Sequence, residues 1–404
     1  MRFLLINQFF VPDAAPTGQL LAHTAQALAE QGHSVRVICA RAPYATGGSH
    51  DSQIPGVDVQ RLACASFGHG AAARLVSYAS FYAGVLRHAL CGPRPDVVFT
   101  LTTPPLLSLA GALAQRLRGA QHVIWEMDLY PDVAVALAVL AQGSFVERAI
   151  GALADFSRRH SDGVIVLGPC MRDRLLARGI PPGKLRVAEN WVDGALFSPR
   201  PFPPHSPLAI LYSGNFGLAH DADTIAGAMA RLGDPARFRF VFAGGGPRRA
   251  ALQARCRAQG MGNVSFIPYQ DHENLDRHFG SCHAGLVTQN PATCGALVPS
   301  KTYAFLAAGR PFIFIGPRGS TAARLVGRHA CGWQIDAGDV PALESLLNLL
   351  AARPDMVRAA GARARRAFLS SYDRPAGVSR ILEILTAPRP EAEPAMTSVP
   401  ATSL

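Results

Sequence analysis

Short apolar runs alternate with amphipathic stretches along the first half of the chain. The runs predict strands at Phe3–Asn7, Ser34–Cys39, Val57–Arg61, Val97–Leu101, His122–Glu126 and Gly163–Leu167. The stretches, with apolar residues every three or four positions, predict helices near Gly18–Gln31, Ala71–Ala89, Leu106–Arg118, Val146–His160 and Cys170–Arg178. Strands that alternate with helices at this spacing form right-handed βαβ units on a parallel sheet.

The proline-rich segment Ser198–Pro207 interrupts this pattern, which then starts again. Strands are predicted at Leu208–Ser213, Phe238–Ala243, Val264–Pro268, Ala284–Val287 and Phe312–Gly316. Helices are predicted at Asp221–Arg231, Arg248–Gln259, Glu273–Ser281, Thr302–Ala308, Thr321–Gly327, Val340–Ala352, Pro354–Ser371 and Ala376–Leu385. We therefore predict an α/β protein with two Rossmann-like domains that face a central cleft. Residues 1–197 form the first domain, 208–371 the second, 372–387 a helix that crosses back to the first, and 388–404 a disordered tail.

Composition supports a two-domain globular protein with anionic partners. The chain has 404 residues, 49% hydrophobic and 17% charged, and a formal net charge of +11. Such a charge suits nucleic acid, nucleotide phosphates or an acidic membrane face. The basic residues are dispersed and almost all arginine, without a block that interleaves aromatics, so nucleic acid is the weakest of the three.

Cysteine usage and the apolar segments argue against a secreted or membrane-spanning chain. The eight cysteines include no CxxC pair, which favours free thiols in a reducing cytosol over a metal or disulfide framework. We expect the apolar N-terminus to be a first buried strand and not a signal peptide. The uncharged run Val97–Gln115 is interrupted by Pro104 and Pro105, so it reads as a strand, a turn and a helix.

Lys301 is the most informative basic residue. The chain has only two lysines, Lys184 and Lys301, among 39 Lys and Arg. Ser300 is a candidate N-cap for the helix that Lys301 opens, and a helix N-terminus attracts anions. A compact ammonium at a phosphate site would explain a lysine in an arginine-rich chain. A solvated lysine at a helix start is the alternative.

Acidic and glycine-rich loops follow several of the predicted strands. Glu126, Asp128 and Asp132 lie within eight residues after an apolar strand, where paired acids suit a base or hydroxyl ligands. Ser213–Gly217 and Gly244–Arg249 follow two strands of the second domain, where glycines let backbone amides meet a phosphate and Arg248 can pair with it. By spacing alone, an Asp132 helix cap and plain strand–helix turns explain these loops equally well.

Taken in order, these segments resemble the family 4 glycosyltransferases of the GT-B fold. The closest resemblance is to bacterial surface-polysaccharide transferases of the colanic-acid or O-antigen fucosamine-transferase type, from Met1 to about Leu385. It rests on Asn7–Asp13, Thr17–Gln19, Asp128–Asp132, Glu189–Asp193, Tyr212–Gly217, Gly244–Pro247, Pro299–Lys301 and Ala307–Pro311.

The resemblance implies a cytoplasmic enzyme that moves a sugar, with retention, from a nucleoside-diphosphate sugar to an acceptor hydroxyl. It implies no metal or other cofactor. Catalytic roles fall on Asp128, Lys301 and Glu126. The donor would contact Gly18, Gly214, Asn215, Arg248, Tyr269, Leu297, Val298 and Ser300, with the nucleobase stacked on Tyr269.

The chain departs from the family at positions that usually bind the donor. Two glutamates seven residues apart are typical, and Ala296 and Ala304 stand at or near their places. An Arg and a Lys-Gly pair usually follow the Gly214 loop, where this chain has Leu218–Asp221. His220 replaces that charge only in part, because imidazole is mostly neutral at pH 7.

The segment Arg74–His88 suggests contact with a membrane. Leu75, Tyr78, Tyr82 and Leu86 share one broad helix face with basic residues at the ends of the segment. Such a helix can rest on an anionic inner membrane face beside a polyprenyl-diphosphate-linked saccharide acceptor. Packing of this face into the core is the alternative.

We therefore expect a glycosyltransferase of bacterial exopolysaccharide, O-antigen or capsule assembly. A GT-B nucleotide-sugar epimerase and a non-catalytic GT-B scaffold are the alternatives. A dehydrogenase is disfavoured, because no strand-linked GxGxxG with a downstream acid occurs.

Overall fold

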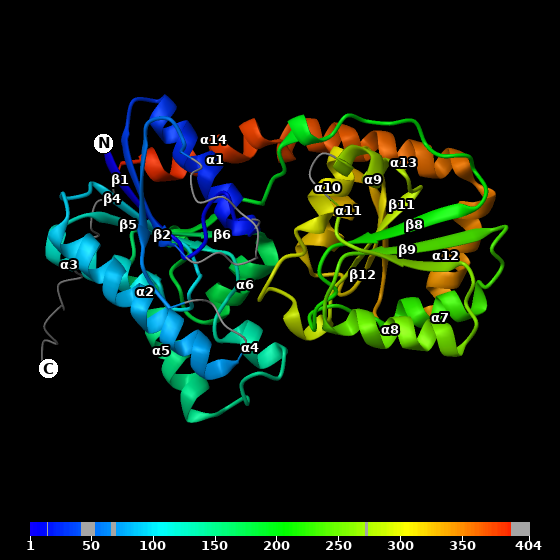
Figure 1. Cartoon of the computed structure of the whole chain (residues 1–404), viewed down its shortest axis with the longest axis horizontal. Helices are drawn as coiled ribbons and strands as arrows, with labels where there is room; N and C mark the ends of the chain where they lie inside the picture. The colour runs from blue at the N-terminus through cyan, green and yellow to red at the C-terminus, as the bar shows by residue number, and fades with distance from the viewer. Residues whose placement is uncertain (14, 42–52, 66–69, 271–273, 389–404) are drawn as a thin grey trace, which may run out of the picture.

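Two parallel sheets, each covered by helices on both faces, make up the protein (Figure 1). The computed structural model describes residues 1–13, 15–41, 53–65, 70–270 and 274–388. The expected tail, apart from Pro388, and the predicted helix start at Glu273 lie outside these residues. No helix of the described part is long and apolar enough to cross a bilayer.

The first sheet has seven parallel strands in the order β3-β2-β1-β4-β5-β6-β7. They are β1 (Arg2–Ile6), β2 (Ser34–Ala40), β3 (Val57–Leu62), β4 (Val97–Thr100), β5 (Gln121–Glu126), β6 (Gly163–Val166) and β7 (Leu185–Val187). The central strands β4 and β6 are buried at every position, as expected of strands covered on both faces. In register, Arg2 pairs with Ser34 and Phe3 with Val97.

Helices cover this sheet in two layers with separate cores. The helices are α1 (Pro16–Glu30), α2 (Ala71–Cys91), α3 (Ser108–Arg118), α4 (Asp132–Ala136), α5 (Phe145–His160) and α6 (Pro169–Ala177). Leu21 and Leu28 of α1 share a buried cluster with Ile381 of the C-terminal helix, while Phe81 of α2 packs with Leu107 and α3 on the other face.

The second sheet has six parallel strands in the order β10-β9-β8-β11-β12-β13. They are β8 (Leu208–Ser213), β9 (Phe238–Ala243), β10 (Val264–Ile267), β11 (Ala284–Thr288), β12 (Phe312–Ile315) and β13 (Gly332–Ile335). The surrounding helices are α7 (Asp223–Arg231), α8 (Pro247–Ala258), α9 (Leu275–Gly280), α10 (Lys301–Ala307), α11 (Thr321–His329), α12 (Val340–Ala352) and α13 (Pro354–Ala367).

The C-terminal helix returns to the first domain. After α13, a π-helical turn (η5, Phe368–Tyr372) leads into α14 (Arg374–Thr386), which lies along α1 (Figure 1). Its buried residues Val378, Ile381 and Leu385 belong to the core of the first domain. The last helix therefore ties the two domains together.

The predicted fold class and parallel sheets are confirmed, and most predicted boundaries differ by one or two residues. Three short elements were missed: β7, β13 and α4. Two of them are partly exposed edge strands that lack a continuous apolar run.

The expected membrane face of α2 is only partly exposed. Tyr82 and Leu86 pack against the core cluster that contains Phe81, and the Tyr82 hydroxyl donates to the Pro105 carbonyl. Leu75 remains exposed, and the side chain of Arg74 lies outside the described residues. Much of this face therefore packs into the core, which was the alternative interpretation.

Candidate functional site: the interdomain cleft

A cleft of about 720 Å³ lies between the two domains. The second domain contributes Ser213, Tyr269, Ser300, Lys301 and Ala304 to its lining. The facing wall consists of residues from α1, from the segment after β7 and from the start of α14: Gln19, His23, Gln26, Trp191, Asp193 and Arg374. Parallel sheets bind ligands at the carboxyl ends of their strands, which is where Ser213 and Tyr269 stand.

Lys301 opens α10 and faces this cleft. Its Nζ lies 3.4 Å from Nε2 of His220 and 5.5 Å from the ring centre of Tyr212. Burial lowers the pKa of Lys301 to about 8. Burial, together with the charge of Lys301, lowers the pKa of His220 to about 3, so this imidazole is neutral at pH 7. A neutral ring thus lies beside the ammonium and leaves its charge available to an anion.

The hydrogen bonds of His220 fix its ring. Nδ1 lies 2.8 Å from the Thr288 carbonyl, which can only accept, so the proton sits on Nδ1. The lone pair on Nε2 then points to the Lys301 ammonium. His220 therefore positions Lys301 and, being neutral, supplies no cation of its own.

Ser300 holds the N-cap position of α10 but does not act as a cap. Its backbone is helical, and its side chain makes no capping hydrogen bond. The helix has only seven residues. Because so short a helix offers little dipole, the anion-binding capacity rests on the Lys301 side chain.

Gly214 makes room for Lys301. A Cβ atom at Gly214 would lie 2.3 Å from Cε of Lys301, and the φ of +130° disfavours any other residue. Gly244 approaches Gly214 equally closely, since its Cβ would lie 2.4 Å from the Gly214 carbonyl oxygen. The two glycine-rich loops therefore pack backbone against backbone beside Lys301.

Hydrogen bonds hold the two glycine-rich loops together. The Phe216 amide donates to the Gly245 carbonyl at 2.7 Å, and the Arg248 amide donates to the Phe216 carbonyl at 3.1 Å. Asn215 is exposed at the tip of its loop. Nε of Arg248 is buried, without a hydrogen-bond partner among the described residues. Arg248 is thus a second cation near His220.

Tyr269 is 60% exposed and lines the cleft. Its ring lies against the second glycine-rich loop, since a Cβ at Gly245 would be 3.3 Å from ring atom Cε2. An exposed aromatic face beside a glycine-rich loop is a suitable platform for a planar ligand.

Among the predicted donor contacts, Tyr269 and Ser300 line the cleft, and the lining does not include Gly18, Gly214, Asn215, Arg248, Leu297 or Val298. Val298 packs against the core of the first domain, and the Leu297 carbonyl accepts a hydrogen bond from Gln289. Gly18 is buried, and a Cβ there would lie 3.0 Å from Cα of Phe10. Gly18, Leu297 and Val298 thus serve packing within and between the domains, and their direct contact with the donor stays a prediction.

Asp128 stands where the two domains meet, outside the lining of the cleft. The next residue, Leu129, donates its amide to the carbonyl of the fully buried Ala296 at 2.8 Å. Burial, with a smaller contribution from the Glu126 charge, raises the pKa of Asp128 to about 6. A carboxylate with a pKa near neutral is suited to proton transfer.

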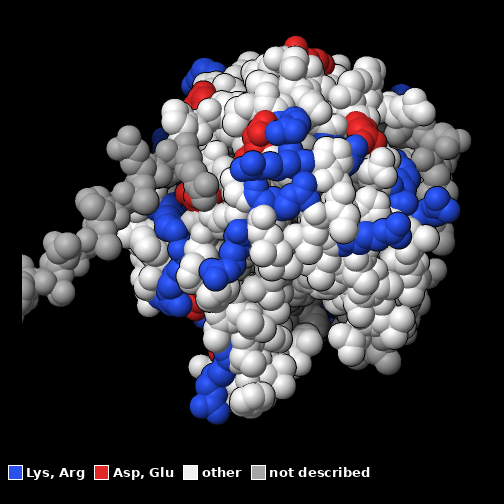
Figure 2. All heavy atoms as spheres, turned by 90° about the vertical axis from the view of Figure 1, so that its left-hand side faces the viewer, with Lys and Arg blue, Asp and Glu red and all other residues white. Residues whose placement is uncertain are grey.

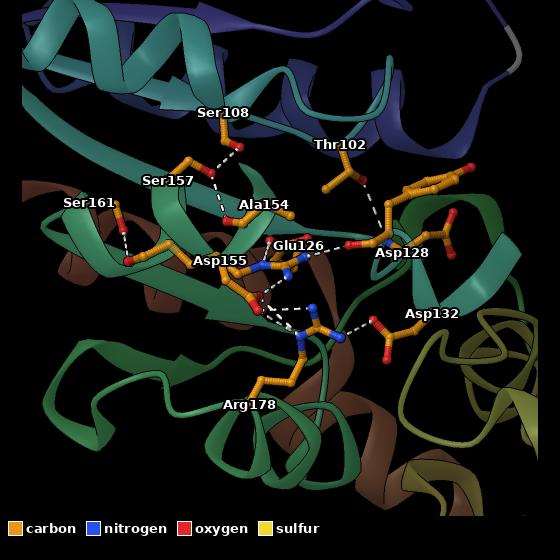
Figure 3. Close-up of polar contacts among 12 residues, drawn as sticks. Thr102, Ser108, Glu126, Asp128, Asp132, Ala154, Asp155, Ser157, Ser161 and Arg178 are labelled. Carbon is orange, nitrogen blue, oxygen red and sulfur yellow. Dashed lines mark hydrogen bonds and ion pairs between the residues drawn. The ribbon is translucent and has the colours of Figure 1, made fainter. Parts of the chain in front are cut away.

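Glu126 is bound in a buried ion pair, which argues against its predicted catalytic role (Figure 3). Nε of Arg158 donates to Oε1 of Glu126 at 2.7 Å, and both side chains are at most 4% exposed. Arg158 also donates to Asp155 at 3.0 Å and to the Tyr130 carbonyl at 3.3 Å. Arg178 joins Asp155 to Asp132, so Asp132 belongs to the same network. Glu126 therefore anchors the loop that presents Asp128.

The sequence assigned no role to the polar wall of the first domain, although Gln19, Trp191 and Asp193 lie in segments that carry the resemblance. Trp191 Nε1 donates to His23 Nδ1 at 3.2 Å, and Arg374 bridges Asp193 at 3.1 Å and Gln26 at 2.8 Å. Gln19, His23 and Gln26 are spaced by four and three residues on α1, and this helical period is the signal that could have found them. Within the described residues no group of three or more His, Cys, Asp or Glu side chains is placed to hold a metal ion.

Residues 17–191 match the family model of the glycosyl transferase 4-like domain. The matched stretch makes up most of the first domain. Two glycosyltransferases also match the chain at 26% identity. WbjE of Pseudomonas aeruginosa aligns with 63% of this chain and 66% of its own length. WcaI of Escherichia coli (strain K12), which is named as a colanic acid biosynthesis glycosyl transferase, aligns with 76% of this chain and 82% of its own length.

Solved structures support the same fold. HepE of Anabaena, solved in complex with UDP-glucose, superimposes with a TM-score of 0.70 at 13% identity, covering 96% of this chain and 99% of that one. The resemblance to surface-polysaccharide glycosyltransferases is thus confirmed, and the chain is a glycosyltransferase with the GT-B fold.

The buried ion pair predicts a large effect on stability. Replacing Arg158 with Met leaves the Glu126 charge buried without its partner, which typically costs about 3–5 kcal/mol. Urea denaturation should show this loss in the free energy of unfolding. Arg159→Met on the same helix is the control, because the Arg159 side chain is 46% exposed and its loss should cost about 1 kcal/mol or less. Equal effects of the two variants would contradict the anchoring role of Glu126.

Proposed function

We propose that this glycosyltransferase transfers a sugar, with retention, from a nucleoside-diphosphate sugar to a saccharide acceptor in surface-polysaccharide assembly. The observation that carries the proposal is Lys301, a partly desolvated ammonium beside the neutral His220 at the edge of a cleft. Two glycine-rich loops and Arg248 lie next to it. Such a site is suited to a diphosphate, and the complex of HepE with UDP-glucose supports this class of donor.

The proposed roles follow the charge that develops during transfer. The bond from the sugar C1 to the diphosphate oxygen breaks, so negative charge grows on the diphosphate, and the acceptor oxygen bonds to C1 on the same face. Lys301 and Arg248 stabilise the leaving diphosphate. The proposal assigns this task to side chains and requires no metal ion or other cofactor. Asp128 takes the proton that the acceptor hydroxyl loses.

Tyr269 and Ala304 define the nucleoside end of the proposed donor site. The base lies against the exposed ring of Tyr269, with Ser300 and Asn215 near the diphosphate. Ala304 lines the cleft where relatives place a glutamate, so the pentose lacks a carboxylate partner at this position. Ribose contacts therefore come from other groups, and the donor binds more weakly than in relatives with that glutamate.

The acceptor and its place in the cell are carried over from the relatives and the resemblance. WcaI is named for colanic acid biosynthesis, which supports a surface polysaccharide as the product. The proposed acceptor is a polyprenyl-diphosphate-linked saccharide at the cytoplasmic face of the plasma membrane. The net charge of +11 suits both this membrane face and a diphosphate-bearing acceptor.

The absence of carboxylates at positions 296 and 304 specifically favours one other function, a scaffold that binds no donor. Ala296 is fully buried and its carbonyl is bonded to Leu129, so this position serves the domain contact. The scaffold and the enzyme differ in whether the cleft binds nucleotide.

Nucleoside diphosphates should raise the melting temperature of the protein. At about a hundred times the dissociation constant, the ligand adds about 2.7 kcal/mol to stability. UDP, GDP, dTDP and ADP are compared by thermal unfolding, with Lys301→Met as the test variant and Lys184→Met as the control. We expect a shift with one nucleotide that only Lys301→Met abolishes. If none of the four shifts the wild-type protein, the scaffold becomes the better description.

Nucleotide affinity should fall as the pH rises through about 8. Lys301 has a lowered pKa of about 8, so it is charged below that pH and neutral above it. Loss of a charge-assisted contact costs about 1.5–3 kcal/mol, which is roughly a tenfold loss of affinity or more. Isothermal titration calorimetry between pH 7 and 9.5 measures this. Lys301→Met should bind weakly and almost independently of pH, and a similar pH profile in both proteins would argue against the role of Lys301.

The turnover number should fall below about pH 6. The raised pKa of Asp128 means that the carboxylate needed to accept a proton is lost as the pH drops through about 6. Asp128→Asn should reduce kcat by roughly 10²–10⁴ and leave nucleotide stabilisation unchanged. The rate of sugar transfer is measured from the amount of nucleoside diphosphate that is released. A variant with normal kcat would remove Asp128 from the mechanism.

A further inference from the structure

The polarity of α5 is reversed relative to an ordinary surface helix. Its buried side includes the polar residues Asp155, Ser157 and Arg158, which take part in the network around Glu126 and the contact with α3. A helix that covers a sheet normally turns its apolar side chains inward. Here the buried positions are already used by ion pairs and hydrogen bonds.

Large apolar side chains therefore project from α5 into solvent. Phe145 is 81% exposed, Phe156 50% and Leu153 45%. Phe145, Leu153 and Phe156 are eight and three residues apart, so they share one helix face. Val146 on the same helix and Val139 in the preceding loop are also exposed, at 52% and 74%. We call these five residues the α5 apolar face, and no segment of the described residues covers it.

Basic residues flank the α5 apolar face. Arg148 and Arg159 are exposed and eleven residues apart, which places them along one side of the helix. The Glu147 carboxylate is turned back and accepts a hydrogen bond from the Gly143 amide at 2.7 Å. Figure 2 shows that the lobe projecting from the lower edge of the first domain consists largely of uncharged residues, with Lys or Arg at its tip.

The start of α5 extends beyond its neighbours. Ser157 contacts Ser108 at the first position of α3, and Gly151, six residues earlier, is still buried beside Pro131 and Arg178. The first six residues of α5, 145–150, therefore extend about 9 Å past these contacts. In Figure 1 this part of α5 forms, with α4 and the nearby end of α2, the lower edge of the first domain. Such a protruding tip is convex, which suits insertion into a lipid bilayer surface.

From the reversed polarity, the protrusion and the flanking arginines, we infer that the α5 apolar face docks the enzyme on an anionic phospholipid surface. Apolar side chains enter the acyl boundary, while Arg148 and Arg159 meet the phosphate headgroups. The inference rests on the proposed function only in that the acceptor is lipid-linked. It moves the membrane contact expected of α2 to α5.

The docking face leads directly into the site. The chain runs from Asp128 at the domain contact through α4, which touches the second domain at η4 (Pro291–Thr293), to Val139 and α5. Insertion of this tip would therefore hold the Asp128 loop close to the headgroup layer, where a lipid-linked acceptor presents its sugar.

Flotation with vesicles tests the docking face on the full chain. The test variant is Phe145→Gln/Leu153→Gln/Phe156→Gln, which keeps the helix and removes only exposed apolar groups. Vesicles contain either phosphatidylcholine alone or phosphatidylcholine with phosphatidylglycerol. We expect the wild type to bind the anionic vesicles and the variant to bind at least about tenfold more weakly.

A matched control separates this face from exposed apolar residues in general. Leu117→Gln/Leu349→Gln/Leu369→Gln removes three side chains that are 60%, 44% and 55% exposed on other elements, and its vesicle binding should equal that of the wild type. A second variant, Arg148→Gln/Arg159→Gln, should lose binding to anionic vesicles selectively and guards against a folding defect in the first.

Three outcomes would overturn the inference. In the first, the wild-type protein does not bind anionic vesicles at low salt. In the second, the α5 variant binds vesicles as well as the wild type does. In the third, the wild type binds no vesicles but self-associates in sedimentation velocity, and the α5 variant does not self-associate. The last would assign the face to a second copy of the chain. Thermal shifts with nucleoside diphosphates are measured on the same samples to separate donor binding from membrane docking. If no shift occurs, the proposed donor site is refuted, but the vesicle result still holds.

Discussion

The site depends on keeping one ammonium charged without a tight acidic partner. Lys301 achieves this through two neighbours that contribute no charge. Gly214 has no side chain and so leaves space for the Lys301 methylenes, and His220 turns a neutral nitrogen toward the ammonium. A carboxylate at the same distance would hold the lysine more firmly, but it would compete with any incoming diphosphate. The lowered pKa of Lys301 is the expected consequence of this arrangement.

The same arrangement depends on the strand ends of the second sheet and on the position of the first domain opposite them. Gly214 follows β8, Gly244 follows β9, and Thr288, which holds His220, ends β11, so three neighbouring parallel strands converge on Lys301. The first domain supplies the facing wall, which includes Arg374 of the returning α14. The Leu129 amide, bonded to the Ala296 carbonyl, adds a direct backbone link between the domains. Ala296, at or near the place where the resemblance leads us to expect a glutamate, therefore serves the contact between the domains.

Much of the fold could be predicted because buried parallel strands are continuous apolar runs. β7 and β13 escaped for the opposite reason, since edge strands mix exposed and buried positions. Lys301 could be singled out by its rarity, and Gly214 by its place after a strand. Glu126 and Asp128 could not be separated, because only the arrangement in space shows that Arg158 lies beside Glu126. His23 and Gln26 were missed because their partners Trp191 and Arg374 come from distant segments.

The reversed polarity of α5 connects the loop that carries Asp128 to the proposed docking face. A buried carboxylate at Glu126 needs a buried cation, and Arg158 of α5 provides it. Arg158 also needs Asp155, one turn earlier, so two charged positions of α5 must face inward. Once they do, the helical period places Phe145, Leu153 and Phe156 on the outside. The ion pair that fixes the loop before Asp128 therefore also determines which side of α5 meets solvent. Exposure of these phenylalanines is thus tied to the same interaction that positions the candidate base.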